Sequence, residues 1–191
     1  MEEGKKRDRR VARTQSLVLG AFYDLMLSRG YDGFTVRDLI DRADIGRSTF
    51  YEHFESKEDV FEHSVAHPLT ALADALLAGA PTDGLRGMVE HFWANRAVAR
   101  ATFDGPPRLV MERVLARLMT ARLERCIREA RNAARAELPL ALVAAQLAGA
   151  QLGLVSAWIE ADGPCDAATL ARALHASGAA MMSALITTAK G

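Results

Sequence analysis

The stretch from Thr35 to Phe54 limits the fold more narrowly than any other part of the sequence, because it encodes two short helices joined by a tight turn. Thr35, followed by Asp38 three residues later, is typical of a capped helix start. Asp44-Ile45-Gly46 provides the turn, and a second short helix is predicted over Arg47–Phe54. The helix before the turn has an apolar stripe made of Val36, Leu39, Ile40 and Ala43.

The helix predicted over Arg47–Phe54 carries two phenylalanines, Phe50 and Phe54, spaced one helical turn apart. We expect both rings to point into a core, so that the opposite face of the helix is turned outward. Two short helices joined by a glycine-containing turn match the helix-turn-helix motif, whose second helix enters the major groove of DNA. The side chains expected on the outward face are those of Arg47, Ser48, Thr49, Glu52 and His53.

Several residues of this region have side chains that suit contacts with DNA. Thr49 and His53 lie one turn apart and offer a hydroxyl, a methyl and an imidazole to the same groove wall. Tyr51 offers a phenol to a phosphate oxygen, and Lys57 combines an ammonium with the free N–H groups of a helix start. Each also has a structural alternative, with Thr35 as a helix cap, Tyr51 as a half-buried core aromatic and Lys57 as a solvated surface residue.

Helical spacing recurs along the whole sequence, and no run of alternating apolar residues indicates a strand. We therefore predict an all-α fold of about nine helices, with a three-helix headpiece followed by a C-terminal helical bundle. Pro68 lies inside the helix that Ser56 caps, so a kink or break is expected there, as a hinge. A linker is expected over 79–84. The other helices are expected from after Asp8 to Gly30, over 85–93, over 98–103, from 108 to 136, from 139 to before 163 and from 167 to 189.

Composition and charge exclude several classes of protein. The 191 residues are 50% hydrophobic and 25% charged with a net charge of zero, so any DNA contact must come from a local patch. Cys126 and Cys165 are too few for a disulfide framework or a zinc site. The apolar run Leu138–Trp158 is interrupted by Gln146 and Gln151, and it predicts a buried helix rather than a membrane span. The basic N-terminus lacks the pattern of a signal peptide, which favours a cytoplasmic protein.

The sequence from Thr35 to Asp59 strongly resembles the DNA-binding segment of the TetR/AcrR family of bacterial regulators. The preceding Arg29–Thr35 also fits, and the resemblance covers about a third of the chain, from Arg13 to Phe61. It implies an all-helical homodimer that binds a near-palindromic DNA operator, represses transcription and is released by a small ligand held in the C-terminal domain. The residues at the family spacing are Thr35, Gly46, Thr49, Tyr51, Phe54 and Lys57.

The resemblance also implies roles for single residues. Thr35, Thr49, Tyr51 and Lys57 are expected to contact phosphate, and Ser48, Thr49 and His53 are expected to face the bases. Arg47 occupies a position that varies in the family, at a helix start from which a side chain can reach base edges or phosphate. The basic arm Lys5–Arg10 is either a minor-groove contact or a solvated tail. The expected domains are a DNA-binding domain over 1–56 and a ligand-binding and dimerisation domain over 57–191.

The C-terminal part gives two further expectations. Small residues on the helix from Pro139, together with the last helix from Ala167, suit a close helix–helix seam. Such a pair would meet its twofold copy in a four-helix bundle, and the alternative is ordinary core within one chain. A small and largely apolar effector is expected to bind among large side chains, which are otherwise plain core. The candidate effector-binding residues are His91, Trp93, Phe103 and Trp158.

Two other classes of protein remain as alternatives. An enzyme would need a positioned nucleophile and base or a cluster of metal ligands. His63 and His67 lie one turn apart, but no third ligand has matching spacing, and neither a metal nor another cofactor is expected. A helical interaction protein that has lost DNA binding would lack the contact set, yet Thr49, Tyr51 and Lys57 are all present.

Overall fold

The computed structural model describes residues 2–75, 83–129 and 134–188. Within them the chain forms nine α-helices, one short 3₁₀ helix and two short strands. It divides into two compact units, Met1–Ser64 and Val65–Gly191, which are described separately below. The assignment of roles to two domains stays a prediction. Most of the predicted linker, 79–82, lies outside the described residues, as does the predicted end of the last helix at Ala189.

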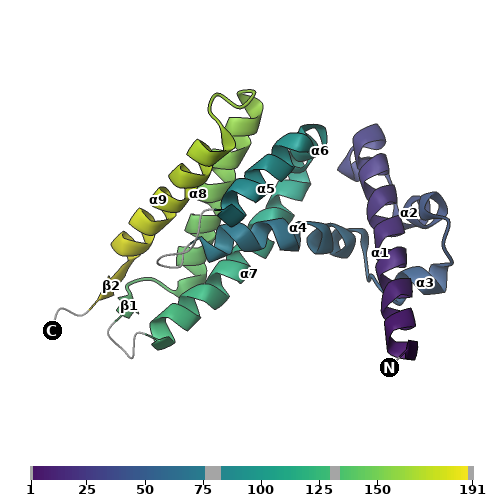
Figure 1. Cartoon of the computed structure of the whole chain (residues 1–191), viewed down its shortest axis with the longest axis horizontal. Coiled ribbons are helices and arrows are strands. Elements are labelled where there is room, and N and C mark those ends of the chain that lie inside the picture. Colours follow the sequence, from purple (N-terminus) through teal and green to yellow (C-terminus); the bar gives the residue numbers. More distant parts are fainter. Residues whose placement is uncertain (1, 76–82, 130–133, 189–191) are drawn as a thin grey trace. The chain divides into compact units, whose positions relative to one another are not determined.

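The N-terminal unit consists of helices packed around a cluster of phenylalanines. Its elements are α1 (Glu2–Arg29), η1 (Tyr31–Gly33), α2 (Val36–Ala43), α3 (Arg47–Tyr51) and the first part of α4 (Lys57–Asp74) (Figure 1). The buried ring of Phe22 on α1 lies 5.8 Å from that of Phe61 on α4 and 5.6 Å from that of Phe34, centroid to centroid. Aromatic pairs at such separations add attraction to the burial of their area, so these rings join α1 to α4.

Two helix boundaries in this unit differ from those expected. The first helix begins at Glu2 and not after Asp8, so the backbone of the basic arm Lys5–Arg10 is helical. The side chains of residues 2–8 lie outside the described part of the structure. The third helix ends at Tyr51 and not at Phe54. After Tyr51 the backbone tightens into a turn, because the His53 N–H donates to the Phe50 carbonyl three residues back at 3.0 Å. The Phe54 N–H also donates to this carbonyl, at 2.9 Å, with the helical spacing of four residues.

Pro68 does not break α4, which runs continuously from Lys57 to Asp74. A kink or break was expected from the hydrogen bond that a proline cannot donate, and the continuous helix contradicts the break. Burial on both sides of Pro68 opposes this loss, because Val65, Leu69 and Leu72 are at most 5% exposed. Tertiary packing of an apolar face contributes more to helix stability in proteins than local propensity does.

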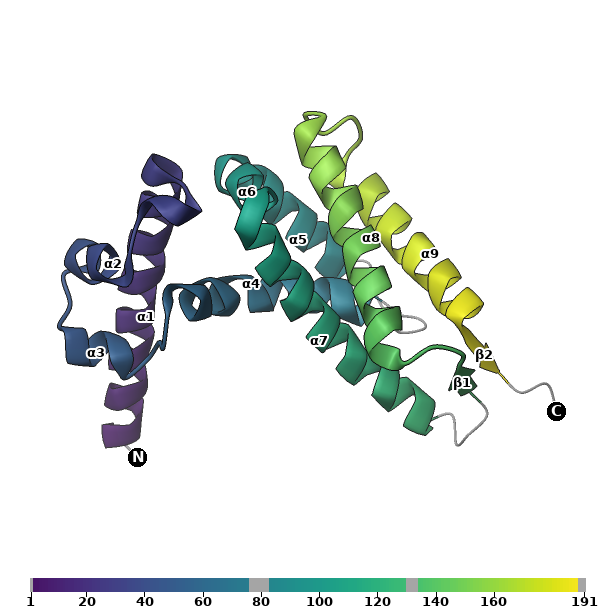
Figure 2. The ribbon, with the colours of Figure 1, turned by 180° about the vertical axis from the view of Figure 1, so that it is seen from behind.

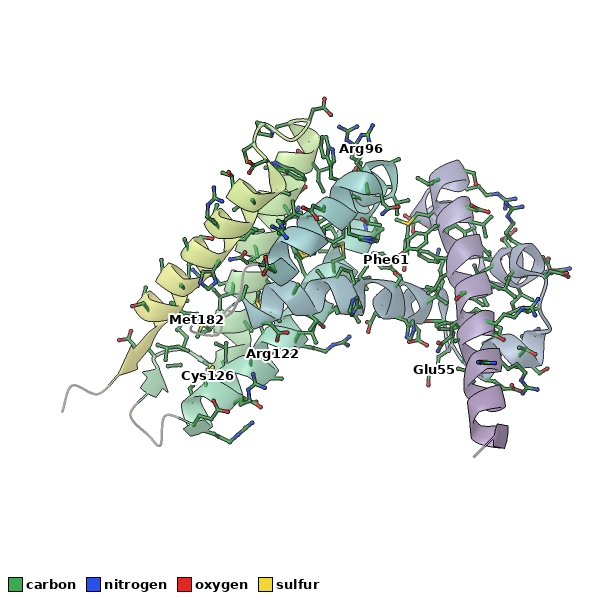
Figure 3. All side chains as sticks on the ribbon, viewed as in Figure 1. Glu55, Phe61, Arg96, Arg122, Cys126 and Met182 are labelled. Carbon is green, nitrogen blue, oxygen red and sulfur yellow. The ribbon has the colours of Figure 1, made fainter. Side chains whose placement is uncertain are left out.

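The C-terminal unit is a helical bundle, as expected. After the end of α4 it contains α5 (Asp83–Ala94), α6 (Arg96–Thr102), α7 (Gly105–Glu129), α8 (Leu140–Glu160) and α9 (Ala167–Leu185). The long helices α7 and α8 pack along each other, and α9 packs beside α5 and α8 (Figures 1 and 2). Arg122, labelled on α7 in Figure 3, donates to the carboxylate of Asp74 at 2.9 Å and so joins α7 to the end of α4.

The sequence did not predict the two strands. Ala134–Ala136 (β1) pairs antiparallel with Ile186–Thr188 (β2), so the helix expected from 108 to 136 in fact ends at Glu129. The last helix likewise ends at Leu185. Alanine and arginine favour a helix locally, but main-chain pairing with a segment distant in sequence overrides this preference. The β-branched residues of 186–188 favour the extended form.

Helix α8 is apolar and long enough to cross a membrane by length and composition alone, with a mean hydropathy of 1.6. It lies between α7 and α9 in the bundle, and Gln151 in its middle donates to the Leu174 carbonyl on α9 at 3.1 Å. One face of α8 is thus buried in the bundle as predicted, while Leu142 and Leu154 on the same helix are exposed. Its buried residues are Val143, Ala144, Leu147, Ala148, Gln151, Leu152, Val155, Ser156, Trp158 and Ile159.

Candidate nucleic-acid interface

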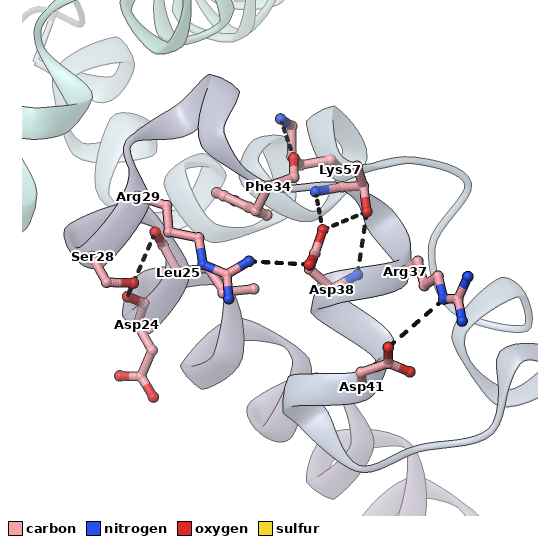
Figure 4. A network of polar contacts seen from close by, with 10 residues as sticks. Asp24, Leu25, Ser28, Arg29, Phe34, Arg37, Asp38, Asp41 and Lys57 are labelled. Carbon is pink, nitrogen blue, oxygen red and sulfur yellow. Dashed lines mark hydrogen bonds and ion pairs between the residues drawn. The ribbon is translucent and has the colours of Figure 1, made fainter.

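The start of α2 is fixed by the capping box that the sequence predicted. The Thr35 hydroxyl accepts a hydrogen bond from the Asp38 N–H at 3.3 Å, and the Asp38 carboxylate accepts from the Thr35 N–H at 2.8 Å. The Thr35 hydroxyl also donates to this carboxylate at 2.6 Å, and the Arg29 guanidinium donates to it at 3.0 Å (Figure 4). These hydrogen bonds, those from Thr35 first, lower the pKa of Asp38 from 3.8 to about 2.

The turn between α2 and α3 contains one residue in the left-handed backbone region, and that residue is Asp44, with φ 51° and ψ 51°. Its N–H donates to the carbonyl of Asp41, and that of Ile45 donates to the carbonyl of Ile40. Gly46, with φ −69°, is the N-cap residue of α3. An aspartate tolerates the left-handed conformation better than most side chains do. The turn therefore depends on Asp44 in its backbone geometry as well as on Gly46.

Phe50 and Phe54 anchor α3 as predicted, since they are 0% and 2% exposed and their ring centroids lie 5.8 Å apart. The opposite side of this segment faces solvent. Arg47, Ser48 and Glu52 are exposed, and Thr49 and His53 are half-buried. The predicted orientation of the helix is thus confirmed, whereas the roles of these side chains toward DNA stay predictions.

Tyr51 is 49% exposed, and its ring contacts a cation. The Arg47 guanidinium lies over the ring, 5.7 Å from its centroid, and the edge of the neighbouring Phe50 ring packs at 5.3 Å. An arginine stacked on a ring keeps its N–H donors directed sideways, available to carboxylate, phosphate or base oxygens. Arg47 and Tyr51 thus form a pair on the exposed side of α3.

Lys57 was predicted to contact phosphate, and in the structure its ammonium binds groups of the N-terminal unit. Its Nζ donates to the carbonyl oxygen of Tyr31 at 2.6 Å. It also donates to the carbonyl oxygen of Phe34 at 3.0 Å (Figure 4). The same nitrogen lies 4.4 Å from the centroid of the Tyr31 ring and 4.7 Å from that of the Phe34 ring. Burial lowers the pKa of Lys57, and the nearby Asp32 carboxylate opposes this effect. Sequence analysis missed these contacts, although the two aromatic residues around the turn were a usable signal.

Ser56 caps α4 as predicted. Its hydroxyl accepts from the Asp59 N–H at 3.0 Å, and the Asp59 carboxylate accepts from the Glu55 N–H at 2.9 Å. These two hydrogen bonds fix the direction in which the chain enters α4 after the turn that follows α3. Lys57, the first residue of α4, is positioned by the same cap.

The four candidate effector residues of the C-terminal unit lie in two aromatic groups. Trp93 and Trp158 pack with ring centroids 5.0 Å apart, and the Trp158 indole N–H donates to the Cys165 carbonyl at 2.9 Å. In the second group, the ring of Phe92 lies 5.5 Å from that of the buried Phe103 and 6.0 Å from that of the exposed His91. Two hollows in the described part of the surface are lined by other residues. The effector site thus stays a prediction.

Comparison with known proteins gives matches to bacterial regulators. Residues 19–63 match the family model described as bacterial regulatory proteins, tetR family. The HTH-type transcriptional regulator TcmR of Streptomyces glaucescens is 32% identical over 72 residues, which are 38% of this chain and 30% of TcmR. The HTH-type dhaKLM operon transcriptional activator DhaS of Lactococcus lactis is 35% identical over 65 residues, which are 32% of this chain and 35% of DhaS. The matched segment thus spans about a third of the length of these relatives.

Solved structures of similar fold extend the likeness to most of the chain. A TetR-family regulator from Streptomyces coelicolor superposes with a TM-score of 0.60 at 19% identity, covering 90% of this chain and 96% of its own. A protein described as a TetR-family transcriptional regulator from Syntrophomonas wolfei gives a TM-score of 0.56 at 16% identity, covering 86% and 92%. At sequence identities this low, the superpositions show that the all-helical fold is shared and nothing beyond the fold. The region of residues 19–63 thus matches the TetR family of bacterial regulatory proteins.

Proposed function

We propose that this protein is a transcriptional regulator that binds a near-palindromic DNA operator as a homodimer through α3. The observation that carries the proposal is the orientation of α3, which Phe50 and Phe54 hold to the core while Arg47, Ser48 and Tyr51 remain exposed. A short helix anchored on one face and polar on the other suits insertion into a major groove.

The chemistry of the exposed side chains supports two roles on this face of α3, contact with bases and contact with phosphates. Ser48, Thr49 and His53 are proposed to read base edges, because hydroxyl and imidazole groups can both donate and accept hydrogen bonds. Tyr51 is proposed to bind phosphate through its phenol. Arg47, stacked on the Tyr51 ring, is proposed to reach either a base edge or a neighbouring phosphate. Phosphate contacts give affinity and base contacts give specificity, so variants of the two kinds should behave differently.

A gel-shift experiment with DNA from upstream of the protein's own gene tests the proposal. Binding by the wild type should weaken steeply with salt, because cations that contact phosphates displace counterions. Tyr51→Ala should weaken binding to all retained sequences similarly, and His53→Ala should change which sequence is preferred. Glu62→Gln, a change on α4, is the matched control. Unchanged binding by Tyr51→Ala would remove the phosphate contact from the proposal.

The dimer is proposed to form through α8 and α9. Both helices bury one face within the unit and expose another face made largely of small or apolar residues. Small residues let two helix backbones approach closely, and the twofold copy would complete a four-helix bundle. The exposed residues concerned are Leu142, Ala145, Ala150, Leu154 and Ala157 on α8 and Ala173, Ala176, Ala180 and Ala184 on α9.

We further propose that a small, largely apolar effector binds in the C-terminal unit and releases the operator. Trp93, Trp158 and Phe103 supply the apolar surface, and His91 supplies a polar group at the edge. Trp93 and Trp158 are the two tryptophans of the chain, so intrinsic fluorescence reports on this region. An effector that changes operator affinity without changing this fluorescence would place its site elsewhere.

We propose that the protein represses transcription. We also propose that it acts in the cytoplasm and has no enzymatic activity. DhaS, one of the relatives, is by its name an activator, so the direction needs its own test. Deletion of the gene should raise transcription from the promoter that carries the operator. A fall in transcription would show activation.

A further inference from the structure

We propose that Lys57 is a positioning residue. It joins the start of α4 to the connection between α1 and α2 and thereby fixes where α2 begins. The effect of Lys57 on DNA binding rests on the proposed function. The four contacts of the ammonium, two carbonyl oxygens and two ring faces, all belong to Tyr31 and Phe34. We call this arrangement the Lys57 latch. It gives Lys57 a role different from that of a phosphate ligand.

The latch depends on the shape of the connection between α1 and α2. Gly30 has a left-handed φ of 72°, and Gly33 lies so close to α1 that an added Cβ would come within 2.9 Å of the Arg29 Cβ. The chain then becomes extended at Phe34, with φ −146°. Two carbonyl oxygens of this tight connection accept from the same ammonium. One compact cation therefore holds both ends of the segment Tyr31–Phe34.

The position of the latch in the chain connects it to the recognition helix. Phe34 is followed directly by Thr35, the N-cap of α2, and α2 leads through the Asp44 turn into α3. On its other side, Lys57 is the first residue of α4, the helix that continues from the N-terminal unit into the C-terminal unit. A displacement of the start of α4 would therefore act on the Tyr31–Phe34 connection and on the cap of α2.

An arginine cannot replace the lysine in this arrangement. The ammonium is a compact charge that can direct separate N–H groups at two carbonyls while it touches two rings. The guanidinium is planar and wider, and its fixed fork suits carboxylate and phosphate. Lys57→Arg should hence preserve a phosphate contact and disrupt the latch. Lys57→Met should abolish both.

Hydrogen exchange of the free protein tests the latch without DNA. In Lys57→Met and Lys57→Arg, the amides of residues 31–39 should exchange at least about tenfold faster than in the wild type, because hydrogen bonds to a charged group are lost. Arg37→Met is the matched control, since the Arg37 side chain is 92% exposed on α2. It should leave exchange in this segment unchanged. Wild-type exchange in both Lys57 variants would overturn the proposal.

Operator binding distinguishes the latch from a phosphate contact. With the duplex that the wild type selects, both Lys57 variants should bind about tenfold or more weakly while the dependence of log K on log salt keeps its slope. A phosphate ligand instead predicts that Lys57→Arg binds like the wild type and that Lys57→Met reduces the slope by about 0.9. Wild-type binding by Lys57→Arg together with the reduced salt slope of Lys57→Met would overturn the proposal of the Lys57 latch.

Tyr31→Leu removes one ring of the latch without removing a charge. It should weaken operator binding, and its effect combined with Lys57→Met should be smaller than the sum of the two, since both act on one contact. Additive effects would contradict the latch. If the wild type selects no duplex while exchange at 31–39 still responds to Lys57 variants, the proposed function fails and the latch stands.

Discussion

Asp38 illustrates how a single exposed side chain can set the start of a helix in this protein. Its carboxylate binds the Thr35 N–H, the Thr35 hydroxyl and the Arg29 guanidinium, so it joins the end of α1 to the first turn of α2. The sequence predicted the cap from the spacing of Thr35 and Asp38. It did not predict the Arg29 contact, because pairing between residues of two helices depends on how those helices pack.

The low pKa of Asp38 leads to a prediction on stability at acid pH. Since the folded pKa, about 2, lies below the ordinary value of 3.8, the ionised carboxylate stabilises the fold above about pH 4. This contribution should be lost as the pH falls from 4 toward 2. Urea unfolding between pH 2 and 5 should show a smaller loss for Asp38→Asn than for the wild type. Asp41→Asn, one turn later in α2, should follow the wild type, and an equal loss in Asp38→Asn would refute the cap's role.

Gly163 provides a second prediction for a single residue. It has a left-handed φ of 62°, and an added Cβ would lie 3.0 Å from two ring carbons of Trp93 and 3.4 Å from one of Trp158. Gly163→Ala should therefore destabilise the protein by about 1–2 kcal/mol, from the backbone strain and the contact with the Trp93 ring. The control is Gly87→Ala in α5, where no atom lies within 4 Å of the added Cβ. Calorimetric melting should show a lower Tm for the first variant and an equal or higher Tm for the control.

Among the secondary-structure elements, helices were predicted where apolar residues repeat with the helical period, and these apolar residues form the buried faces of the helices. The spacing of Phe50 and Phe54 correctly gave the buried face of α3. The apolar run of 138–158 correctly gave a helix, α8, of which one face is buried in the bundle and another is exposed. The end of α7 and the pairing of β1 with β2 could not be predicted, because a strand of three residues gains its stability from a distant partner. The continuity of α4 through Pro68 likewise depends on packing.

The anchoring of α3 predicts a large effect of one truncation. Phe50→Ala removes a ring that is 0% exposed and should cost about 3–5 kcal/mol, because it leaves a cavity in a core that cannot fully close. Tyr51→Ala, the adjacent and 49% exposed position, should cost less than about 1 kcal/mol. Urea unfolding monitored by circular dichroism compares the two. Similar costs would contradict the orientation of α3.

For the whole molecule, the proposed function needs two copies of α3 held at a fixed spacing. A single α3 reads few base pairs, and a twofold dimer presents two such helices to successive major grooves, about 34 Å apart. The exposed faces of α8 and α9 supply the surface for this dimer in the proposal. The sequence suggested these two helices from their small residues, and the structure adds which faces remain exposed.

Sedimentation velocity tests this dimer. The wild type should sediment as a dimer at micromolar concentration, and Leu142→Glu, at a 57% exposed position on α8, should shift it toward monomer, because a charge would be buried without a partner. Leu27→Glu is the matched control, since Leu27 is 52% exposed on α1. It should remain dimeric. A wild-type monomer would contradict the proposed assembly.

The most direct test of the central claim is unbiased selection of duplexes from a random library by the purified full-length protein. If paired α3 helices read DNA, the enriched sequences should contain an inverted repeat whose half-sites are centred about one helical turn apart. His53→Ala should alter the bases preferred within each half-site, and the spacing of the half-sites should stay the same. Recovery of no enriched sequence, or of one without twofold symmetry, would contradict the claim that this chain is a dimeric operator-binding regulator.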